Sequence, residues 1–266
     1  MKATSPTRTS TRTSTRLPAG LPAALVLGIV TLLAACGSSG PRTDPTNAAQ
    51  YNAQLGATYL QRGDIDQAKE KLERALQQDE GNALAHVAYA RLQQRVGRDD
   101  SARIHFARAI ELQPDEAEHR NAYGAFLCGV GDLSQAEAQF RTAATDPYYD
   151  TPEAALDNAG LCMLDNDRLD TAEEYLRDAL RVNPRHASAW LHMAELLHRQ
   201  ERLTVADAYF QRYQVLGPAT AESLMLGHLI RRDSGDLRGA ETFASRLLSD
   251  FPASLEAGDY LSRPLD

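Results

Sequence analysis

Six alanines recur along the chain at an almost constant spacing. Successive members are separated by 34, 34, 36, 34 and 34 residues: Ala68, Ala102, Ala136, Ala172, Ala206 and Ala240. A period near 34 that extends over most of a chain is typical of an array of helix pairs. The spacing therefore predicts the fold class before any single residue is interpreted, and it favours a binding surface over catalysis.

The same residue types recur around each alanine. Gly-Asp pairs, such as Gly63-Asp64 and Gly131-Asp132, are suited to end the first helix of a unit, and Pro114 or Pro184 separates one unit from the next. Small residues allow the two helices of a unit to approach closely, while Leu, Phe and Tyr form an apolar stripe of helical period. Because no unit can bury its apolar face alone, the units must stack.

This pattern resembles the tetratricopeptide repeat. The resemblance implies an all-α, right-handed superhelical solenoid of six helix-turn-helix repeats over residues 49–254, with units that begin near residues 49, 83, 117, 153, 187 and 220. We expect residues 255–266 to form a C-terminal tail.

The one irregular step, of 36 residues, falls at Asp146–Pro152. Two prolines bound this segment, which we expect to be an extended connection between units three and four. It is either a tolerated loop insertion or a protruding aromatic contact made by Tyr148 and Tyr149.

Residues 1–35 have the character of an export signal. They contain four basic residues and no acidic one, and they end in an apolar run over Leu21–Ala35 that Pro22 interrupts. The run is too short and too broken for a comfortable membrane span, but it suits the hydrophobic region of a signal peptide. We therefore expect residues 1–35 to be removed.

The apolar run ends in Leu33–Gly37, which reads Leu-Ala-Ala-Cys-Gly and resembles the bacterial lipobox. The resemblance implies a diacylglyceryl group on the Cys36 sulfur, cleavage before Cys36 and acylation of the new N-terminus; the alternative is a cysteine that merely ends a signal peptide. Two or more acyl chains anchor a protein stably. Gly37 replaces the Asp that retains many lipoproteins at the inner membrane, which favours a lipid anchor in the outer membrane, facing the periplasm. Residues 36–48 would then be the lipidated cysteine and a flexible tether.

The charge balance argues against nucleic acid as a partner. The chain has 28 basic and 36 acidic residues. Without the four basic residues of the signal, 24 basic and 36 acidic residues remain, a net charge of −12. Nucleic-acid binding calls for a basic stripe instead.

Export would leave Cys128 and Cys162 in an oxidising compartment, where cysteines pair if the geometry allows. Both fall late in the first helix of adjacent units. Neighbouring helices lie about 8–10 Å apart, and facing Cα atoms can then meet the roughly 4.4–6.8 Å that a disulfide needs. We predict a Cys128–Cys162 disulfide, with two independent buried thiols as the alternative.

The motif that most resembles a chemical site is His192-x-x-Glu195-x-x-His198, whose three side chains share one helical face. Carboxylate-bridged metal bundles need a second such helix facing it, and the zinc protease signature spaces its histidines differently. A polar groove lining is therefore favoured over a metal site. We find no phosphate loop or nucleophile motif, and we expect no enzyme, no cofactor, no metal and no small-molecule substrate.

In the tetratricopeptide family the first helix of each unit lines the concave face, and the resemblance implies the same here. Arg91 and Arg95 lie one helical turn apart and would present donors on one side, so we expect an extended partner segment of acidic character. For each groove residue, solvation or packing between units is the alternative. The residues assigned to the groove are Leu60, Leu84, Val87, Arg91, Arg95, Asn121, Asp157, Asn158, Leu161, Leu164, Leu191 and His198.

A lipobox, a short tether and six repeats together resemble the type IV pilus biogenesis lipoproteins of the PilF/PilW family. The stretches that carry the resemblance are Leu55–Gly63, Asn121–Leu127, Asp157–Leu161, Ser223–Gly227 and Phe251–Glu256. The resemblance implies a pilotin, which helps secretin subunits of the type IV pilus machine to reach or assemble in the outer membrane. The alternative is a lipoprotein adaptor for another envelope machine or a cell-wall hydrolase.

Overall fold

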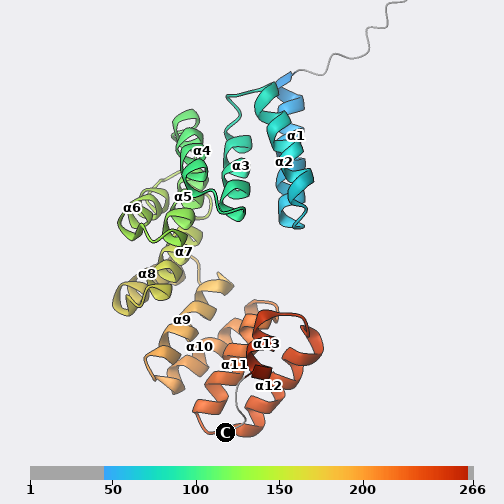
Figure 1. The fold of residues 1–266 in the computed structure, drawn as a ribbon. Coiled ribbons are helices and arrows are strands. Elements are labelled where there is room, and N and C mark those ends of the chain that lie inside the picture. Colours follow the sequence, from blue (N-terminus) through green and yellow to red (C-terminus); the bar gives the residue numbers. More distant parts are fainter. Residues whose placement is uncertain (1–44, 263–266) are drawn as a thin grey trace, which may run out of the picture. The chain divides into compact units, whose positions relative to one another are not determined.

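The computed structural model describes residues 45–262, which form helices and short connections with no strand. Twelve helices follow one another as six pairs, and a further helix comes after them (Figure 1). The first helices of the pairs are α1 (Pro45–Gln61), α3 (Ala83–Arg95), α5 (Ala117–Gly129), α7 (Pro152–Asp165), α9 (Ala187–Arg199) and α11 (Ala221–Asp233). The second helices are α2 (Ile65–Gln78), α4 (Asp99–Leu112), α6 (Leu133–Ala144), α8 (Leu169–Val182), α10 (Leu203–Leu216) and α12 (Leu237–Asp250), and the last helix is α13 (Leu255–Ser262). The predicted all-α repeat architecture is confirmed.

Five of the six pairs begin within one residue of the starts expected from the sequence. The first pair begins at Pro45, so the end of the segment expected to be a tether, up to residue 48, is helical. The segment expected to be a signal peptide, Cys36 and the rest of the expected tether lie outside the described residues. No helix within residues 45–262 combines the length and apolar character that crossing a membrane would require.

A left-handed residue follows each first helix and turns the chain back. Asp167 and Glu201 take this place in units four and five, with φ of 56° and 58°. Glycine fills it in the other four units, because a residue without Cβ adopts positive φ without strain. These glycines are Gly63, Gly97, Gly131 and Gly235. In units one and six the aspartate after the glycine then caps the second helix: Asp64 accepts from the Gln67 amide at 3.2 Å and Asp236 from the Gly239 amide at 2.9 Å.

Close approach of the two helices in each unit explains the periodic small residues. All six periodic alanines are buried. In unit three, a Cβ added to Gly124 would lie only 2.8 Å from the Cδ1 and Cε1 atoms of the buried Phe140 ring. In unit four, a Cβ on Gly160 would lie 2.6 Å from Leu176 Cγ. A large side chain of the second helix therefore fits against the first helix only where the first helix has a very small residue.

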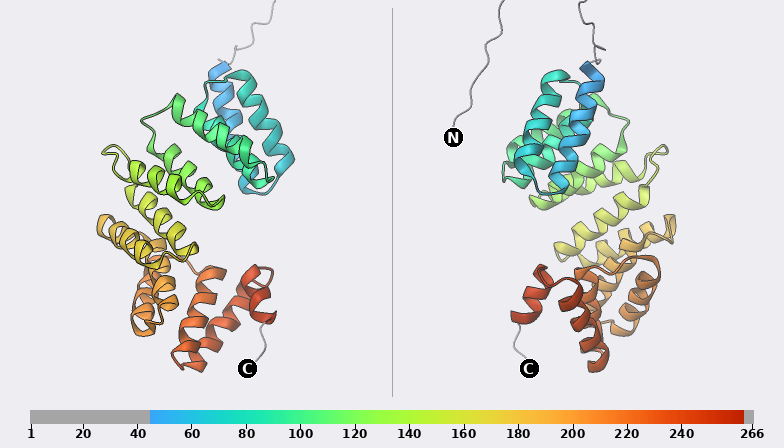
Figure 2. Two further views of the ribbon diagram at one scale, coloured as in Figure 1. Left: turned by 60° about the vertical axis from the view of Figure 1, so that its left-hand side comes forward. Right: turned by 90° about the vertical axis from the view of Figure 1, so that its right-hand side faces the viewer.

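The helices form an inner and an outer layer. Each first helix contacts the first helix of the next unit, from α1 through α11. Each second helix packs on its own first helix and on the following one. Second helices meet one another through side chains, as where the Tyr175 hydroxyl of α8 donates to Glu137 of α6 at 2.8 Å. Figure 2 shows the same succession of pairs from two further directions. The first helices are thus the inner layer, and one buried apolar cluster runs without interruption from unit two to unit six.

The segment expected to be a C-terminal tail contains helix α13. Ala257 and Tyr260 of α13 join an apolar cluster with Leu224, Met225 and Leu247 of the last unit. Tyr260 also meets the edge of the His228 ring, with 5.1 Å between the ring centroids. A terminal unit has no next neighbour to cover its apolar face. Helix α13 supplies this cover.

A disulfide joins units three and four. Cys128 of α5 and Cys162 of α7 have an S–S distance of 2.07 Å and a Cα–Cα distance of 5.9 Å. The bridge connects the two units on either side of the irregular connection, and the loop that it closes has a sequence separation of 34 residues.

The substitution Gly124→Ala should lower the free energy of unfolding. Overpacking against Phe140 costs about 1–3 kcal/mol, which exceeds the gain of about 1 kcal/mol that alanine brings to a helix. Gly258→Ala is the control, because nothing lies within 4 Å of a Cβ at that position of α13, and it should raise stability. Urea midpoints measure both changes; a midpoint for Gly124→Ala at or above that of the parent would refute the close-approach argument.

Reduction of the Cys128–Cys162 bridge should lower the free energy of unfolding by about 2–4 kcal/mol, because a loop of this length then regains its entropy in the unfolded chain. Urea unfolding with and without reductant measures the difference. The double variant Cys128→Ala with Cys162→Ala should respond to reductant not at all. If reductant lowered the stability of the double variant as much as that of the parent, the loss of stability would not come from the Cys128–Cys162 bridge.

Candidate functional site

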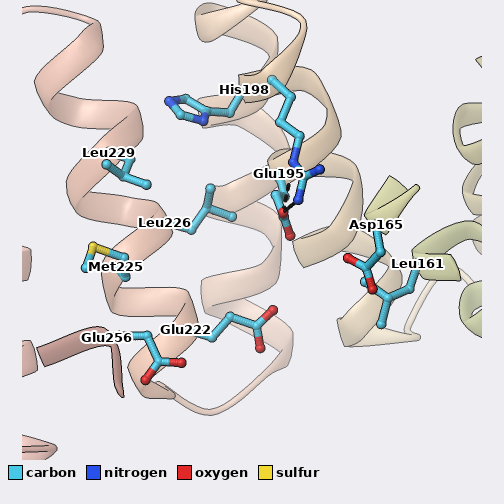
Figure 3. Close-up of a pocket in the computed structure, with 10 residues that line it drawn as sticks. Leu161, Asp165, Glu195, His198, Glu222, Met225, Leu226, Leu229 and Glu256 are labelled. Atoms are coloured by element: carbon cyan, nitrogen blue, oxygen red, sulfur yellow. Dashed lines mark hydrogen bonds and ion pairs between the residues drawn. The ribbon is translucent and has the colours of Figure 1, made fainter. Parts of the chain in front are cut away.

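Helices α7, α9, α11 and α13 enclose a pocket of about 570 Å³ (Figure 3). Its lining comes from the first helices of units four, five and six and from the terminal helix. The lining residues are Leu161 and Asp165 of α7, Glu195, His198 and Arg199 of α9, Glu222, Met225, Leu226 and Leu229 of α11, and Glu256 of α13. The pocket therefore lies in the inner layer, where the repeat architecture predicts a binding surface.

The pocket combines an apolar lining with acidic groups. Leu229 of α11 and Leu161 of α7 are partly exposed and reach the space from two sides, whereas Met225 and Leu226 are buried beside them. Figure 3 shows the Glu222 and Glu256 carboxylates together at one end of the pocket and His198 at the other.

Two of the lining side chains already have carboxylate partners. The Arg199 guanidinium pairs with Glu195 in the same helix and also donates to the Leu164 carbonyl at 3.0 Å. His198 Nε2 lies 2.7 Å from Asp233 Oδ2. Both side chains are therefore held by neighbouring residues.

Three other carboxylates, on Asp165, Glu222 and Glu256, have no basic partner within ion-pair distance among residues 45–262. Loss of water and then the Glu195 charge raise the pKa of Asp165. Loss of water also raises the pKa of Glu222; the His192 charge opposes this rise, and the charges of Glu195, Glu256 and Asp165 add to it. The Arg199 and His192 charges oppose the rise for Asp165. With four carboxylates and one arginine in its lining, the pocket keeps an excess of acidic groups.

A buried polar cluster beneath the pocket fixes α7 against α9. Asp157 of α7 is only 3% exposed. Its Oδ2 accepts from Ser188 Oγ at 2.6 Å and lies 3.0 Å from His186 Nε2, and its Oδ1 lies 2.8 Å from His192 Nδ1. Three hydrogen bonds across the junction of units four and five hold the two helices that carry Leu161 and Glu195.

The cluster shifts the pKa values of two of its members. Burial raises the pKa of the Asp157 carboxyl, but the hydrogen bonds from His186, His192 and Ser188 outweigh it and hold this pKa well below its usual range. Burial lowers the pKa of the His192 imidazole, but the hydrogen bond and charge of Asp157 raise it above the ordinary value. The pair is therefore stabilised as carboxylate and imidazolium.

The structure separates the predicted groove residues into two groups. Arg91 and Arg95 of α3 are exposed, Leu84 is half-buried, and Leu161 lines the pocket. Four others are part of the packing between helices, which was the alternative left open for them. Leu60, Val87, Leu164 and Leu191 are buried in apolar clusters.

Asn121 and Asn158 connect units three and four by a hydrogen bond. Asn158 Nδ2 donates to Asn121 Oδ1 at 2.9 Å, and Asn121 Nδ2 donates to the Tyr149 hydroxyl at 3.1 Å. The Tyr149 hydroxyl in turn donates to Glu118 at 2.7 Å. Burial, with the Glu118 carboxylate as an additional cause, raises the pKa of Tyr149 to about 12. Of the two tyrosines in the irregular connection, Tyr148 is the exposed one, at 91%.

The His192, Glu195 and His198 side chains do not act together. Each has a partner of its own: Asp157 for His192, Arg199 for Glu195 and Asp233 for His198. Within the described part of the chain, no group of three or more His, Cys, Asp or Glu side chains is placed to hold a metal ion.

The sequence analysis missed the part of the pocket that unit six and α13 supply. One signal was present: apolar residues occur on two sides of α11, as Leu224 and Met225 beside Leu226 and Leu229. A helix that is apolar on more than one side is covered from more than one side. Nothing in the pattern assigned Glu256, because the segment after unit six was expected to be a tail.

The Asp157 cluster should make stability depend on pH at both ends of its range. The lowered pKa of Asp157 contributes stability above the usual aspartate value of about 3.9, and this is lost as the pH falls through the lower folded value. The raised pKa of His192 contributes stability below about 6.5, and this is lost as the pH rises through the higher folded value. The parent should therefore exceed Asp157→Asn most strongly between about pH 4 and 6.5, by about 2–3 kcal/mol.

Urea unfolding of both proteins across this range measures the difference. Asp115→Asn is the control, because Asp115 is exposed, and it should follow the parent at every pH. A difference between parent and Asp157→Asn that stays constant with pH would contradict the charged-pair assignment.

Comparison with known proteins identifies tetratricopeptide repeats at residues 59–126 and 159–221. The chain is 31% identical over 234 residues to the type IV pilus assembly protein PilF of Pseudomonas aeruginosa, covering 86% of this chain and 93% of that protein. The crystal structure of PilW, a widely conserved type IV pilus biogenesis factor, matches with a TM-score of 0.68 and 32% identity over 80% of this chain and 98% of that one. A solved structure of Pseudomonas aeruginosa PilF matches with a TM-score of 0.65 and 30% identity over 83% of this chain and 99% of that one. A repeat array with this similarity over almost the whole length of its relatives belongs to the PilF/PilW family of tetratricopeptide-repeat proteins of type IV pilus biogenesis.

Proposed function

We propose that the chain is an outer-membrane lipoprotein that acts as a pilotin, promoting the localisation and multimerisation of the type IV pilus secretin by binding a secretin segment. The observation that carries this proposal is the similarity to PilF and PilW over almost their whole length. The lipobox around Cys36 adds a means of membrane attachment.

The repeat array supports a function in protein binding and not in catalysis. Its inner layer offers a pocket between units, and its polar clusters at Asp157 and Asn121 have hydrogen-bond partners that lock helices together. Rigid elements of this kind present a preformed surface, which reduces the cost of ordering the site on binding.

The acyl chains would contribute by anchoring the protein at the membrane where the secretin assembles. A scaffold anchored at the outer membrane and a secretin subunit directed to the same membrane meet at a raised effective concentration. Modest affinity in the inner layer is then sufficient to gather subunits for assembly. Assembly by this mechanism requires both the lipid anchor and binding by the repeats.

Replacement of the anchor should therefore uncouple binding from assembly. In cells that carry Cys36→Ala, the protein should leave the outer-membrane fraction, and heat-resistant secretin multimers should fall to the level of a gene deletion while monomers accumulate. Immunoblots of separated membranes measure both. Ser39→Ala in the same segment is the matched control and should leave multimers at the parental level.

Normal secretin multimers in the deletion strain would refute the pilotin role. Co-purification from detergent-solubilised envelopes then identifies the client. Recovery of a peptidoglycan enzyme or another envelope machine in place of secretin would support the adaptor function considered from the sequence.

A further inference from the structure

We infer that the pocket between α7, α9, α11 and α13 binds a partner segment that presents apolar side chains flanked by lysine or arginine. The inference rests on the proposed function in that it specifies the chemistry of the partner segment. It differs from the expectation drawn from Arg91 and Arg95, which favoured an acidic segment.

The first argument is the apolar half of the pocket. Leu161 and Leu229 are partly exposed on opposite helices, with the buried Met225 and Leu226 beside them. A volume of about 570 Å³ lies within the range of roughly 300–1,000 Å³ that is usual for ligand pockets. An apolar side chain placed between the two leucines would lose its water on both sides, and this drives association.

The second argument is the uncompensated charge. Six acidic or basic side chains line the pocket. Arg199 is paired with Glu195 and His198 with Asp233, whereas the carboxylates of Asp165, Glu222 and Glu256 have no basic partner within ion-pair distance among residues 45–262. These groups repel one another across three different helices. A cationic side chain on the partner would relieve that repulsion, whereas an anionic one would add to it.

The charge also distinguishes a partner segment from a second copy of the chain. A twofold dimer brings the same patch of each copy together. Glu222 and Glu256 of one copy would then face the same carboxylates of the other. The net charge of the whole chain, −8, opposes such a contact further, so complementarity favours a basic segment of a different protein.

Helix α13 makes the site specific to the end of the array. Glu256 comes from α13, and Ala257 next to it is buried in the apolar cluster that docks this helix on α11 and α12. No other junction of units in the described chain has an added helix beside it, so the same combination of groups does not recur elsewhere in the inner layer.

Fluorescence anisotropy with three labelled peptides tests the inference, with the full-length protein held in zwitterionic lipid nanodiscs and empty nanodiscs as the blank. The first peptide has two leucines between two lysines in a Gly-Ser context. The second replaces the lysines with glutamates, and the third replaces the leucines with serines. The lysine–leucine peptide should bind at least tenfold more tightly than either other peptide, and its affinity should fall as salt is added.

Variants then locate the binding. Glu222→Gln with Glu256→Gln removes two charges at constant shape and should weaken binding about tenfold; Leu229→Ser should weaken it through the apolar half. The matched control is Glu174→Gln with Glu241→Gln, two exposed carboxylates on the second helices α8 and α12, which should leave the affinity unchanged.

Several outcomes would overturn the inference: no binding of the lysine–leucine peptide, equal binding of the glutamate peptide, or full affinity in the Gln double variant. If the protein forms a dimer and the Gln double variant changes that dimerisation, the pocket binds a second copy of the chain, and the inference is overturned as well. The pilotin role is judged separately by secretin multimers in cells. If the lysine–leucine peptide does not bind but secretin multimers still depend on Cys36, the inference about the pocket is refuted and the pilotin role is not.

Discussion

The structure depends on how closely two helices can approach within each unit. In units three and four, Gly124 and Gly160 of the first helices leave space for Phe140 and Leu176 of the second helices. The periodic alanine of each unit is buried as well. A pair packed in this way is thin and has apolar surface left on both sides. Each unit must therefore be covered by the next, and the chain extends as a stack because no other arrangement buries those faces. The order of the units and the layer of first helices both follow from this one constraint.

The candidate site is a consequence of where the stack stops. Within the array, each first helix is in contact with the first helices of the preceding and following units. After unit six the cover comes from α13, which is a single short helix and fills less space than a pair. The apolar face of α11 is only partly covered, and Leu229 stays partly accessible in the same pocket as the Glu222 and Glu256 carboxylates. Polar locks such as the Asp157 cluster keep α7 and α9 in place on the other side.

The sequence predicted the repeats well and the site only in part. Spacing alone identified the helix pairs, since the alanines and the large apolar residues report packing that recurs in every unit. Individual groove positions were harder, because a first helix is covered on several sides and its periodicity does not tell which apolar residues face a neighbour. Leu60 and Val87 were assigned to a partner surface but are buried in apolar clusters, while Leu161, assigned to the same surface, lines the pocket. The segment at 255–262 has too few residues to show a period, so its helix and the contribution of Glu256 became visible only in three dimensions.

One wall of the pocket is α13, which within residues 45–262 packs only on α11 and α12, and this has a thermodynamic consequence. Elements at the end of an array open with a smaller free energy than elements in its middle. A partner that needs Glu256 in place binds only the fraction of molecules in which α13 is docked, so its apparent affinity is its intrinsic affinity reduced by that fraction. Changes in the apolar contacts of Tyr260 or Ala257, which do not line the pocket, would then tune binding by altering how often α13 is docked.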